Sequence, residues 1–224
     1  MSRLSGNSGD ARATVHHPLF ARFYTRLSVL AEKQGETAAH RTELLSGLSG
    51  RVVEVGAGNG LNFGHYPPGV TRVSAVEPEP RLRRLAVAAG RRAAVPVEVM
   101  PGTAEELPLG DGHFDAAVAS LVLCSVRDLP RALAEIRRVL RPGGELRFYE
   151  HGRAGRPAAD RVQRALDRTV WPKLFGGCHT GRDTLAEIAA AGFEIGPHRR
   201  LRVPGQGLPL PCSPHVLGVA RRPE

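Results

Sequence analysis

A short loop rich in glycine is the first feature of the sequence that could do chemistry. Gly56, Gly58 and Gly60 stand directly after the β-branched stretch Arg51–Val55. Glycines let the backbone turn sharply and leave room for a ligand against bare peptide groups, while the helix that follows presents free N–H donors. The loop therefore predicts a site for a polar ligand. A purely structural strand-to-helix turn is the alternative, because a glycine turn alone is a weak signal.

A carboxylate lies at the spacing from this loop that a ribose-binding residue has. Glu77 follows the next strand-like stretch and lies 21 residues after Gly56. In nucleotide-binding α/β domains an acidic residue about 20 residues after the loop accepts hydrogen bonds from the ribose hydroxyls. The pair predicts a ligand that contains a nucleoside, and the alternative is an ordinary solvated carboxylate before a proline. The dinucleotide fingerprint does not match, because it places its third glycine where this chain has Leu61.

A histidine stands at the end of another predicted strand. Glu150 and His151 close the stretch Glu145–Glu150 at the rim of the expected cleft. An imidazole with a reference pKa of about 6.5 can take up a proton at neutral pH, so His151 is the candidate catalytic base. The alternative is a histidine that hydrogen-bonds to a loop carbonyl.

The cysteines do not form a recognisable metal or redox motif. Cys124, Cys178 and Cys212 are 54 and 34 residues apart, and no Cys-x-x-Cys pair exists. We expect each to be a small buried apolar residue in a reducing compartment. Cys178, preceded by two glycines, is also a candidate for the wall of an acceptor pocket. Three histidines also lack ligand partners at a suitable spacing: His16, His17 and His40. No metal site is predicted.

Strand-like and helix-like stretches alternate around these residues. Strands are expected at Arg51–Val55, Val73–Val76, Val97–Met100, Phe114–Ser120, Glu145–Glu150, Phe193–His198 and Val216–Ala220. Helices are expected at Pro80–Ala89, Leu129–Leu140, Pro157–Phe175 and Arg182–Ala191, with two more between His17 and Leu48 that part near Gly35. This alternation predicts an α/β fold, a Rossmann-like, doubly wound, mostly parallel seven-stranded sheet with N-terminal helices. We expect a disordered tail over residues 1–16, a helical segment over 17–50 and one α/β domain over 51–224.

The composition restricts the classes of partner. The formal net charge is +9, but the arginines are scattered in ones and twos and form no patch interleaved with aromatic residues. Nucleic-acid binding is therefore not expected. No apolar run approaches the roughly 18 residues of a membrane span, and the N-terminus has no signal-peptide core. We expect no integral membrane segment and a cytoplasmic location, and the sequence does not indicate an oligomeric state.

Three segments together resemble the class I S-adenosylmethionine (SAM)-dependent methyltransferases. Glu54–Gly60 resembles the first motif of that family, and Val76-Glu77-Pro78 resembles its ribose-binding segment. Gly102–Pro108, followed by Phe114-Asp115, resembles its adenine-side loop and fourth strand. The likeness covers about residues 51–150. It implies SAM as the cofactor and methyl transfer to a small-molecule substrate.

The resemblance also implies which residues bind SAM. The methionine part is expected against the loop of Gly56, Ala57, Gly58 and Asn59, with Glu54 directly ahead of that loop as a further cofactor-binding residue. The ribose hydroxyls are expected at Glu77, with Pro78 beside it. The adenine is expected beside Thr103, Ala104 and Glu105, and the sulfonium beside Ser120 and Leu121.

The second half is similar to the methyltransferase-like alkyl-thiol S-methyltransferases of microsomal membranes. The likeness lies in Leu121–Val126, Arg141–Gly144, Glu150-His151, Trp171, Leu174-Phe175, Gly177-Cys178, Pro214-His215 and Gly218, together with Tyr66–Gly69. It implies a thiol as the first choice of acceptor, before an oxygen, nitrogen or carbon centre. The apolar segment Ser120–Leu123 stands where enzymes that methylate nucleic-acid bases place Asp/Asn-Pro-Pro-aromatic, so the wall suits an aligned, desolvated nucleophile. The alternative from another class is a non-catalytic SAM-binding or nucleic-acid-binding protein.

Overall fold

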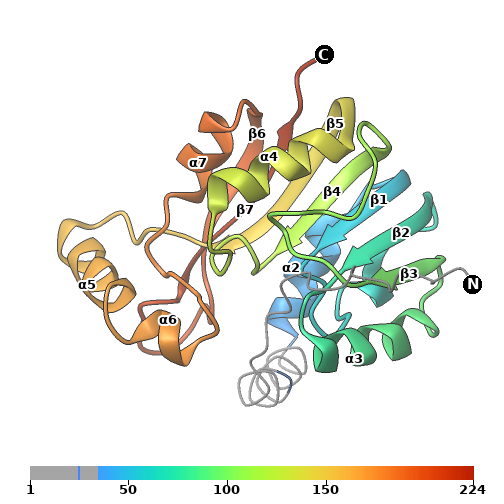
Figure 1. Cartoon of the computed structure of the whole chain (residues 1–224). Coiled ribbons are helices and arrows are strands. Elements are labelled where there is room, and N and C mark those ends of the chain that lie inside the picture. The colour runs from blue at the N-terminus through green and yellow to red at the C-terminus, as the bar shows by residue number, and fades with distance from the viewer. Residues whose placement is uncertain (1–24, 26–34) are drawn as a thin grey trace, which may run out of the picture.

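The computed structural model describes Thr25 and residues 35–224, in which seven strands form one sheet (Figure 1). The strands are β1 (Gly50–Val55), β2 (Val70–Val76), β3 (Val97–Met100), β4 (Phe114–Ser120), β5 (Leu140–His151), β6 (Glu194–Arg202) and β7 (Pro214–Arg221). Their order across the sheet is β3-β2-β1-β4-β5-β7-β6. Only β7 runs antiparallel to its neighbours β5 and β6. The predicted mostly parallel seven-stranded α/β sheet is confirmed.

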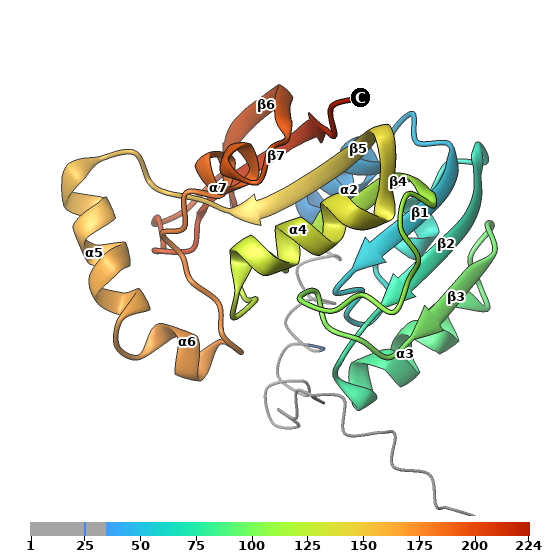
Figure 2. The ribbon, with the colours of Figure 1, turned by 45° about the horizontal axis from the view of Figure 1, so that its top comes forward.

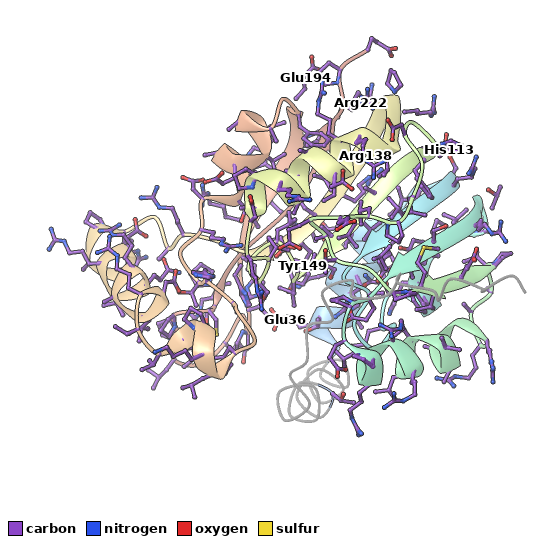
Figure 3. The ribbon with its side chains drawn as sticks, in the orientation of Figure 1. Glu36, His113, Arg138, Tyr149, Glu194 and Arg222 are labelled. Carbon is purple, nitrogen blue, oxygen red and sulfur yellow. The ribbon has the colours of Figure 1, made fainter. Side chains whose placement is uncertain are left out.

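The parallel strands end at one edge of the sheet, and in Figure 2 their arrowheads point the same way. β1 pairs in parallel with β2 and β4, and β4 pairs in parallel with β5. In Figure 3, Tyr149 marks the carboxyl half of β5, while Arg138, Arg222 and Glu194 lie toward the opposite edge. Residues that follow β1, β2, β4 and β5 are therefore brought to the same side of the molecule, where open α/β sheets bind ligands.

Helices cover both faces of the sheet (Figure 1). They are α2 (Glu36–Leu45), α3 (Pro80–Gly90), α4 (Leu129–Val139), α5 (Pro157–Asp167), α6 (Trp171–Leu174) and α7 (Thr184–Ala190), with a 3-10 turn at Phe63–His65. Helices α4 and α7 share one apolar core with Val53, and α2 and α3 share the other with Val52. Successive side chains on a strand point to opposite faces, so an unbroken apolar run such as Val52-Val53 supplies both cores.

Two predicted elements differ from the observed ones. The helix expected over Pro157–Phe175 is two helices, α5 and α6, because Pro172 lies in the first turn of α6 and proline is tolerated at a helix start but not in its interior. Strand β5 begins at Leu140 rather than Glu145. Leu140 pairs with Phe114 and Glu145 pairs with Ala116, so the residues between Leu140 and Glu145 bulge out of register.

The N-terminal predictions are only partly covered. Helix α2 begins after Gly35, whose φ of 82° fits the break expected there. The expected tail over residues 1–16 and the first expected helix lie outside the described residues, apart from Thr25. Among the helices that the structure describes, none is both long enough and apolar enough to cross a bilayer.

Candidate SAM and acceptor site

A cavity of about 470 Å³ lies at the carboxyl edge of the sheet. Eight of the residues predicted to bind SAM line it: Gly56, Gly58, Glu77, Pro78, Thr103, Ala104, Glu105 and Leu121. It is also lined by Glu79, Leu82, Glu106, Val122, Ser125, Val126, Arg127, Asp128, Arg131, Gly176 and Gly177. Glu54, Ala57, Asn59 and Ser120 are not among the lining residues. The fold thus brings segments that are more than 60 residues apart in the sequence to one hollow.

The glycine loop is shaped by two requirements that only glycine meets. Gly56 and Gly58 have φ values of 66° and 57°, in the left-handed region that side chains disfavour. A Cβ on Gly56 would also lie 2.3 Å from Cγ2 of Val122, on the loop after β4. The loops after β1 and β4 therefore approach each other closely along the cavity.

Glu77 joins the glycine loop to the turn after β2. Its side chain lies in the cavity wall and the residue is 5% exposed. Oε2 accepts a hydrogen bond of 2.7 Å from the Gly58 N–H, and Oε1 accepts one of 2.9 Å from the Glu79 N–H. Burial raises the pKa of Glu77, while these two bonds lower it. A carboxylate fixed at the edge of a cavity can accept hydrogen bonds from a ligand diol.

Glu54 lies beneath the glycine loop rather than in the cavity wall. It is 2% exposed, and its oxygens accept hydrogen bonds from the Asn62 side-chain amide at 2.9 Å and from the Tyr66 hydroxyl at 2.6 Å. Burial raises the pKa of Glu54 to about 7, although both hydrogen bonds lower it. The carboxyl group thus ties the end of β1 to the segment after the loop. Nearby, Arg41 donates to Asn62 at 2.6 Å and to the Ser120 hydroxyl at 3.3 Å.

The buried carboxyl of Glu54 should make stability depend on pH. Its pKa rises from an ordinary 4.5 to about 7 on folding, so its contribution is fully present below pH 4.5 and is lost as pH rises through 7. We expect a loss of about 2 kcal/mol of unfolding free energy between about pH 5 and pH 7 from this group. The Glu54→Gln variant cannot titrate there, so its urea-unfolding free energy should change less with pH. Glu98→Gln, which removes a carboxylate with 57% side-chain exposure, is the control. Equal pH dependence in wild type and Glu54→Gln would contradict the assignment.

The adenine-side loop is tied to the loop after β4. Ala104 is buried, and Thr103 forms an isolated bridge with Glu106. One carboxylate oxygen of Glu105 accepts a hydrogen bond of 2.9 Å from the Arg127 N–H, and the Glu105 carbonyl accepts one of 2.9 Å from Arg131 Nε. The Glu105 side chain therefore closes one wall of the cavity.

The turn after β4 depends on a residue that the sequence did not reveal as an anchor. Leu121 has a φ of 58°, in the left-handed region that residues other than glycine rarely adopt. Glu150 is 0% exposed, and its carboxylate accepts backbone hydrogen bonds from Val122 at 3.0 Å, Leu123 at 2.9 Å and Cys124 at 3.2 Å. Burial raises the pKa of Glu150, while these N–H donors lower it. The carboxyl group at the end of β5 holds the wall that follows β4.

His151 lies at the end of β5 as expected, and two cysteines lie beside it. Its Nδ1 is 3.3 Å from Sγ of Cys178, and the ligand atoms of Cys124, His151 and Cys178 all lie within 4.8 Å of one another. A hydrogen bond with Cys178 and burial raise the pKa of the Cys124 thiol well above its ordinary value. The sequence could not predict this cluster, because 54 residues separate its cysteines. His151 does not itself line the cavity, but Gly177, next to Cys178, does. Its role as a base stays a prediction.

The sequence and fold are similar to those of known proteins. A methyltransferase domain family matches residues 53–148. Thiol S-methyltransferase TMT1B of Homo sapiens is 34% identical over 181 residues, which cover 79% of this chain and 73% of TMT1B. Thiol S-methyltransferase TMT1A of Homo sapiens is 32% identical over 215 residues, which cover 90% of this chain and 85% of TMT1A.

Solved structures share the fold. A SAM-dependent methyltransferase of Thermotoga maritima, described as a possible histamine N-methyltransferase, superposes with a TM-score of 0.67 at 23% identity and covers 91% of this chain and 98% of its own. A geranyl diphosphate methyltransferase in complex with GPP and sinefungin superposes with a TM-score of 0.62 at 19% identity, covering 84% of this chain and 79% of its own. At these identities the likeness concerns the fold.

Proposed function

The chain belongs to the SAM-dependent methyltransferases, and from that premise we propose that it methylates the sulfur of a small thiol. The observation that carries the choice of sulfur is the identity of 32–34% with proteins named thiol S-methyltransferases, over 73–85% of their length. These alignments extend beyond the shared methyltransferase domain at residues 53–148. The likeness to proteins named thiol S-methyltransferases therefore covers more of the chain than the methyltransferase domain alone.

The residues around the cavity fit SAM. We propose that the methionine part lies against Gly56 and Gly58, whose backbone is free of side chains. The ribose hydroxyls donate to Glu77, whose carboxylate is already held in the cavity wall by two N–H donors. The adenine lies beside Pro78 and the Thr103–Glu105 segment, which line the adjoining wall. Glu54 lies beneath the glycine loop and fixes the shape of that loop. Ala57 and Asn59 are the other residues of the loop that we propose to lie near the methionine part.

The acceptor lies, in this proposal, against the apolar wall made by Leu121 and Val122. SAM supplies an electrophilic methyl group on a sulfonium. The contribution of the chain is to hold the acceptor in line with that methyl and to exclude water, an effect that can be worth roughly 7–11 kcal/mol. Ser120 ends β4 and Leu121 begins the turn after it, on the side proposed for the sulfonium.

His151 is the residue that we propose to promote loss of the acceptor proton. It follows Glu150, whose carboxylate positions the acceptor wall, and it contacts Cys178 at 3.3 Å. A thiol with a pKa of about 8.5 already supplies a few per cent of thiolate at neutral pH, so modest assistance is enough. An alcohol would need much stronger activation.

A comparison of acceptors tests the choice of sulfur. We expect a lipophilic alkyl thiol to be methylated at least about tenfold faster than the matching alcohol or amine, because only the thiol is appreciably ionised as a strong nucleophile. Glutathione should also be slower, since burying its unpaired charges against an apolar wall is costly. Initial rates with labelled SAM at one concentration give the comparison. Faster transfer to the alcohol or amine would refute the thiol assignment, and SAM binding without transfer to any acceptor would favour a non-catalytic protein.

A further inference from the structure

We propose that Cys124, Cys178 and His151 bind one divalent ion of the zinc class beside the acceptor wall. The three residues come from different parts of the chain: the turn after β4, the segment after α6 and the end of β5. Their two Sγ atoms and one imidazole nitrogen lie within 4.8 Å of one another. Two cysteines and one histidine are a ligand set that proteins use to bind zinc.

The spacing and chemistry of the cluster suit zinc. Zn–S bonds of about 2.3 Å and Zn–N bonds of about 2.0–2.1 Å in a tetrahedron place neighbouring ligand atoms about 3.5–3.8 Å apart. The Cys178 Sγ to His151 Nδ1 distance is 3.3 Å, and small side-chain rotations cover the difference. Thiolate ligands favour zinc over magnesium, calcium or manganese, which prefer oxygen.

The cluster is held by the surrounding fold rather than by its own contacts alone. The Glu150 carboxylate fixes the turn that carries Cys124 through the Cys124 N–H at 3.2 Å. The Cys124 carbonyl accepts a hydrogen bond of 2.8 Å from the N–H of His179, next to Cys178, so the two cysteine segments are joined. The His215 ring packs against His151 with centroids 4.7 Å apart. Contacts outside the ligand set also orient the ligands of known metal sites.

The burial of the two cysteines couples loss of their protons to metal binding. Cys124 is 1% exposed and Cys178 is 6% exposed. Because a buried thiolate is costly without a compensating positive charge, both cysteines can lose their protons here only together with the binding of a cation. A bound divalent ion supplies that charge and converts both thiols to ligands with release of two protons.

The number of ligands points to a catalytic rather than a purely structural ion. Within the described part of the chain the cluster offers three ligands, which leaves a fourth tetrahedral position. Catalytic zinc sites keep three protein ligands and one position for water or substrate. Gly177, adjacent to Cys178, lines the cavity, so the cluster borders the acceptor side.

The inference rests on the proposed thiol acceptor for its functional part. A coordinated thiol gives up its proton to solvent, so an acceptor at the fourth position arrives as a thiolate. The thiolate electron pair forms the new S–CH₃ bond, the methyl–sulfonium bond breaks with its electron pair left on the SAM sulfur, and the metal keeps its charge. His151 then promotes loss of the acceptor proton as a metal ligand and not by taking the proton itself.

Metal content tests the site independently of activity. The full chain is loaded with Zn²⁺ under reducing conditions, dialysed against a moderate chelator and measured by elemental analysis. We expect about one equivalent in wild type and in Cys212→Ser, whose cysteine lies outside the cluster, and less than about a tenth in Cys178→Ser and His151→Ala. Zinc-free wild type or equal zinc in all variants would overturn the site, as would a Cys124–Cys178 disulfide in place of metal.

Two further measurements keep the test independent of variant folding and of the acceptor. Co²⁺ added to zinc-free wild type should give a thiolate-to-cobalt charge-transfer band, and its absence would refute thiolate ligation. Chelated enzyme should methylate a thiol at least about tenfold more slowly and recover with Zn²⁺ but not Mg²⁺. Full activity without metal would refute activation by the ion. If zinc binds as expected and no thiol is methylated in either state, the thiol assignment fails while the metal site stands.

Discussion

Replacing Glu150 by alanine is expected to lower the free energy of unfolding by about 3–5 kcal/mol, because each buried donor left without a partner costs about 1–3 kcal/mol. Three backbone N–H groups, from Val122 to Cys124, donate to this one carboxylate. Removing it also opens a void at a site that is 0% exposed. The turn after β4 should lose its fixed shape.

The matched control is Glu145→Ala on the same strand. Glu145 is a partly exposed carboxylate in ion pairs with Arg147 and Arg221, and such pairs contribute about 0–1 kcal/mol. Urea unfolding of both variants and of Glu150→Gln gives the comparison. Glu150→Gln should be intermediate, since its amide keeps one acceptor oxygen but presents a donor to the remaining N–H groups. Equal losses in Glu145→Ala and Glu150→Ala would show that Glu150 is not an anchor.

The Glu150→Gln variant also tests whether this carboxylate supports SAM binding. Leu121 and Val122 line the cavity, so a turn that has lost its anchor should also bind SAM less tightly. Titration calorimetry of SAM into Glu150→Gln, which should remain folded, separates this effect from global unfolding. A folded Glu150→Gln variant with wild-type SAM affinity would show that the carboxylate does not support SAM binding.

Local patterns were sufficient to predict the sheet and half of the site. The run Arg51–Val55 and the glycines after it have conformational preferences that act within a few residues, and the 21-residue spacing to Glu77 follows from one β-α-β unit. The structure confirms the seven strands and places Gly56, Gly58 and Glu77 at one cavity. In a regular β-α-β fold the spacing of residues in the sequence determines where they lie, so the strands and this part of the site could be predicted from the sequence.

The unpredicted parts depend on contacts between distant segments. In the sequence, Glu150 is an ordinary carboxylate at the end of a predicted strand. In the structure, the left-handed turn at Leu121 directs three N–H groups toward it. Cys124 and Cys178 come together because β4 and β5 are neighbours and the segment after α6 folds back over their ends. Glu54 carries the family motif, yet its oxygens are taken up by Asn62 and Tyr66. No periodicity or motif in the sequence predicts contacts between segments that lie so far apart in the chain.

Replacing Glu77 by alanine is expected to weaken SAM binding by about 1.5–3 kcal/mol, which is roughly 10- to 150-fold in affinity, because hydrogen bonds to a charged acceptor carry about that much. The carboxylate is 5% exposed and faces the cavity, so solvent does not screen or replace these bonds easily. Glu77 also accepts from the Gly58 N–H, and part of the loss should come from a looser glycine loop.

Glu77→Gln separates the two contributions and makes the test sharp. The amide keeps the shape and one acceptor oxygen but loses the charge, so its SAM affinity should lie between those of wild type and Glu77→Ala. Glu106→Ala removes an exposed carboxylate that lines the same cavity and controls for a general loss of negative charge. Titration calorimetry with SAM, together with circular dichroism to verify folding, gives the affinities. Wild-type affinity in folded Glu77→Ala would refute the ribose contact. Equal weakening in Glu106→Ala would mean that the cavity attracts the cationic ligand through its overall charge and not through one fixed carboxylate.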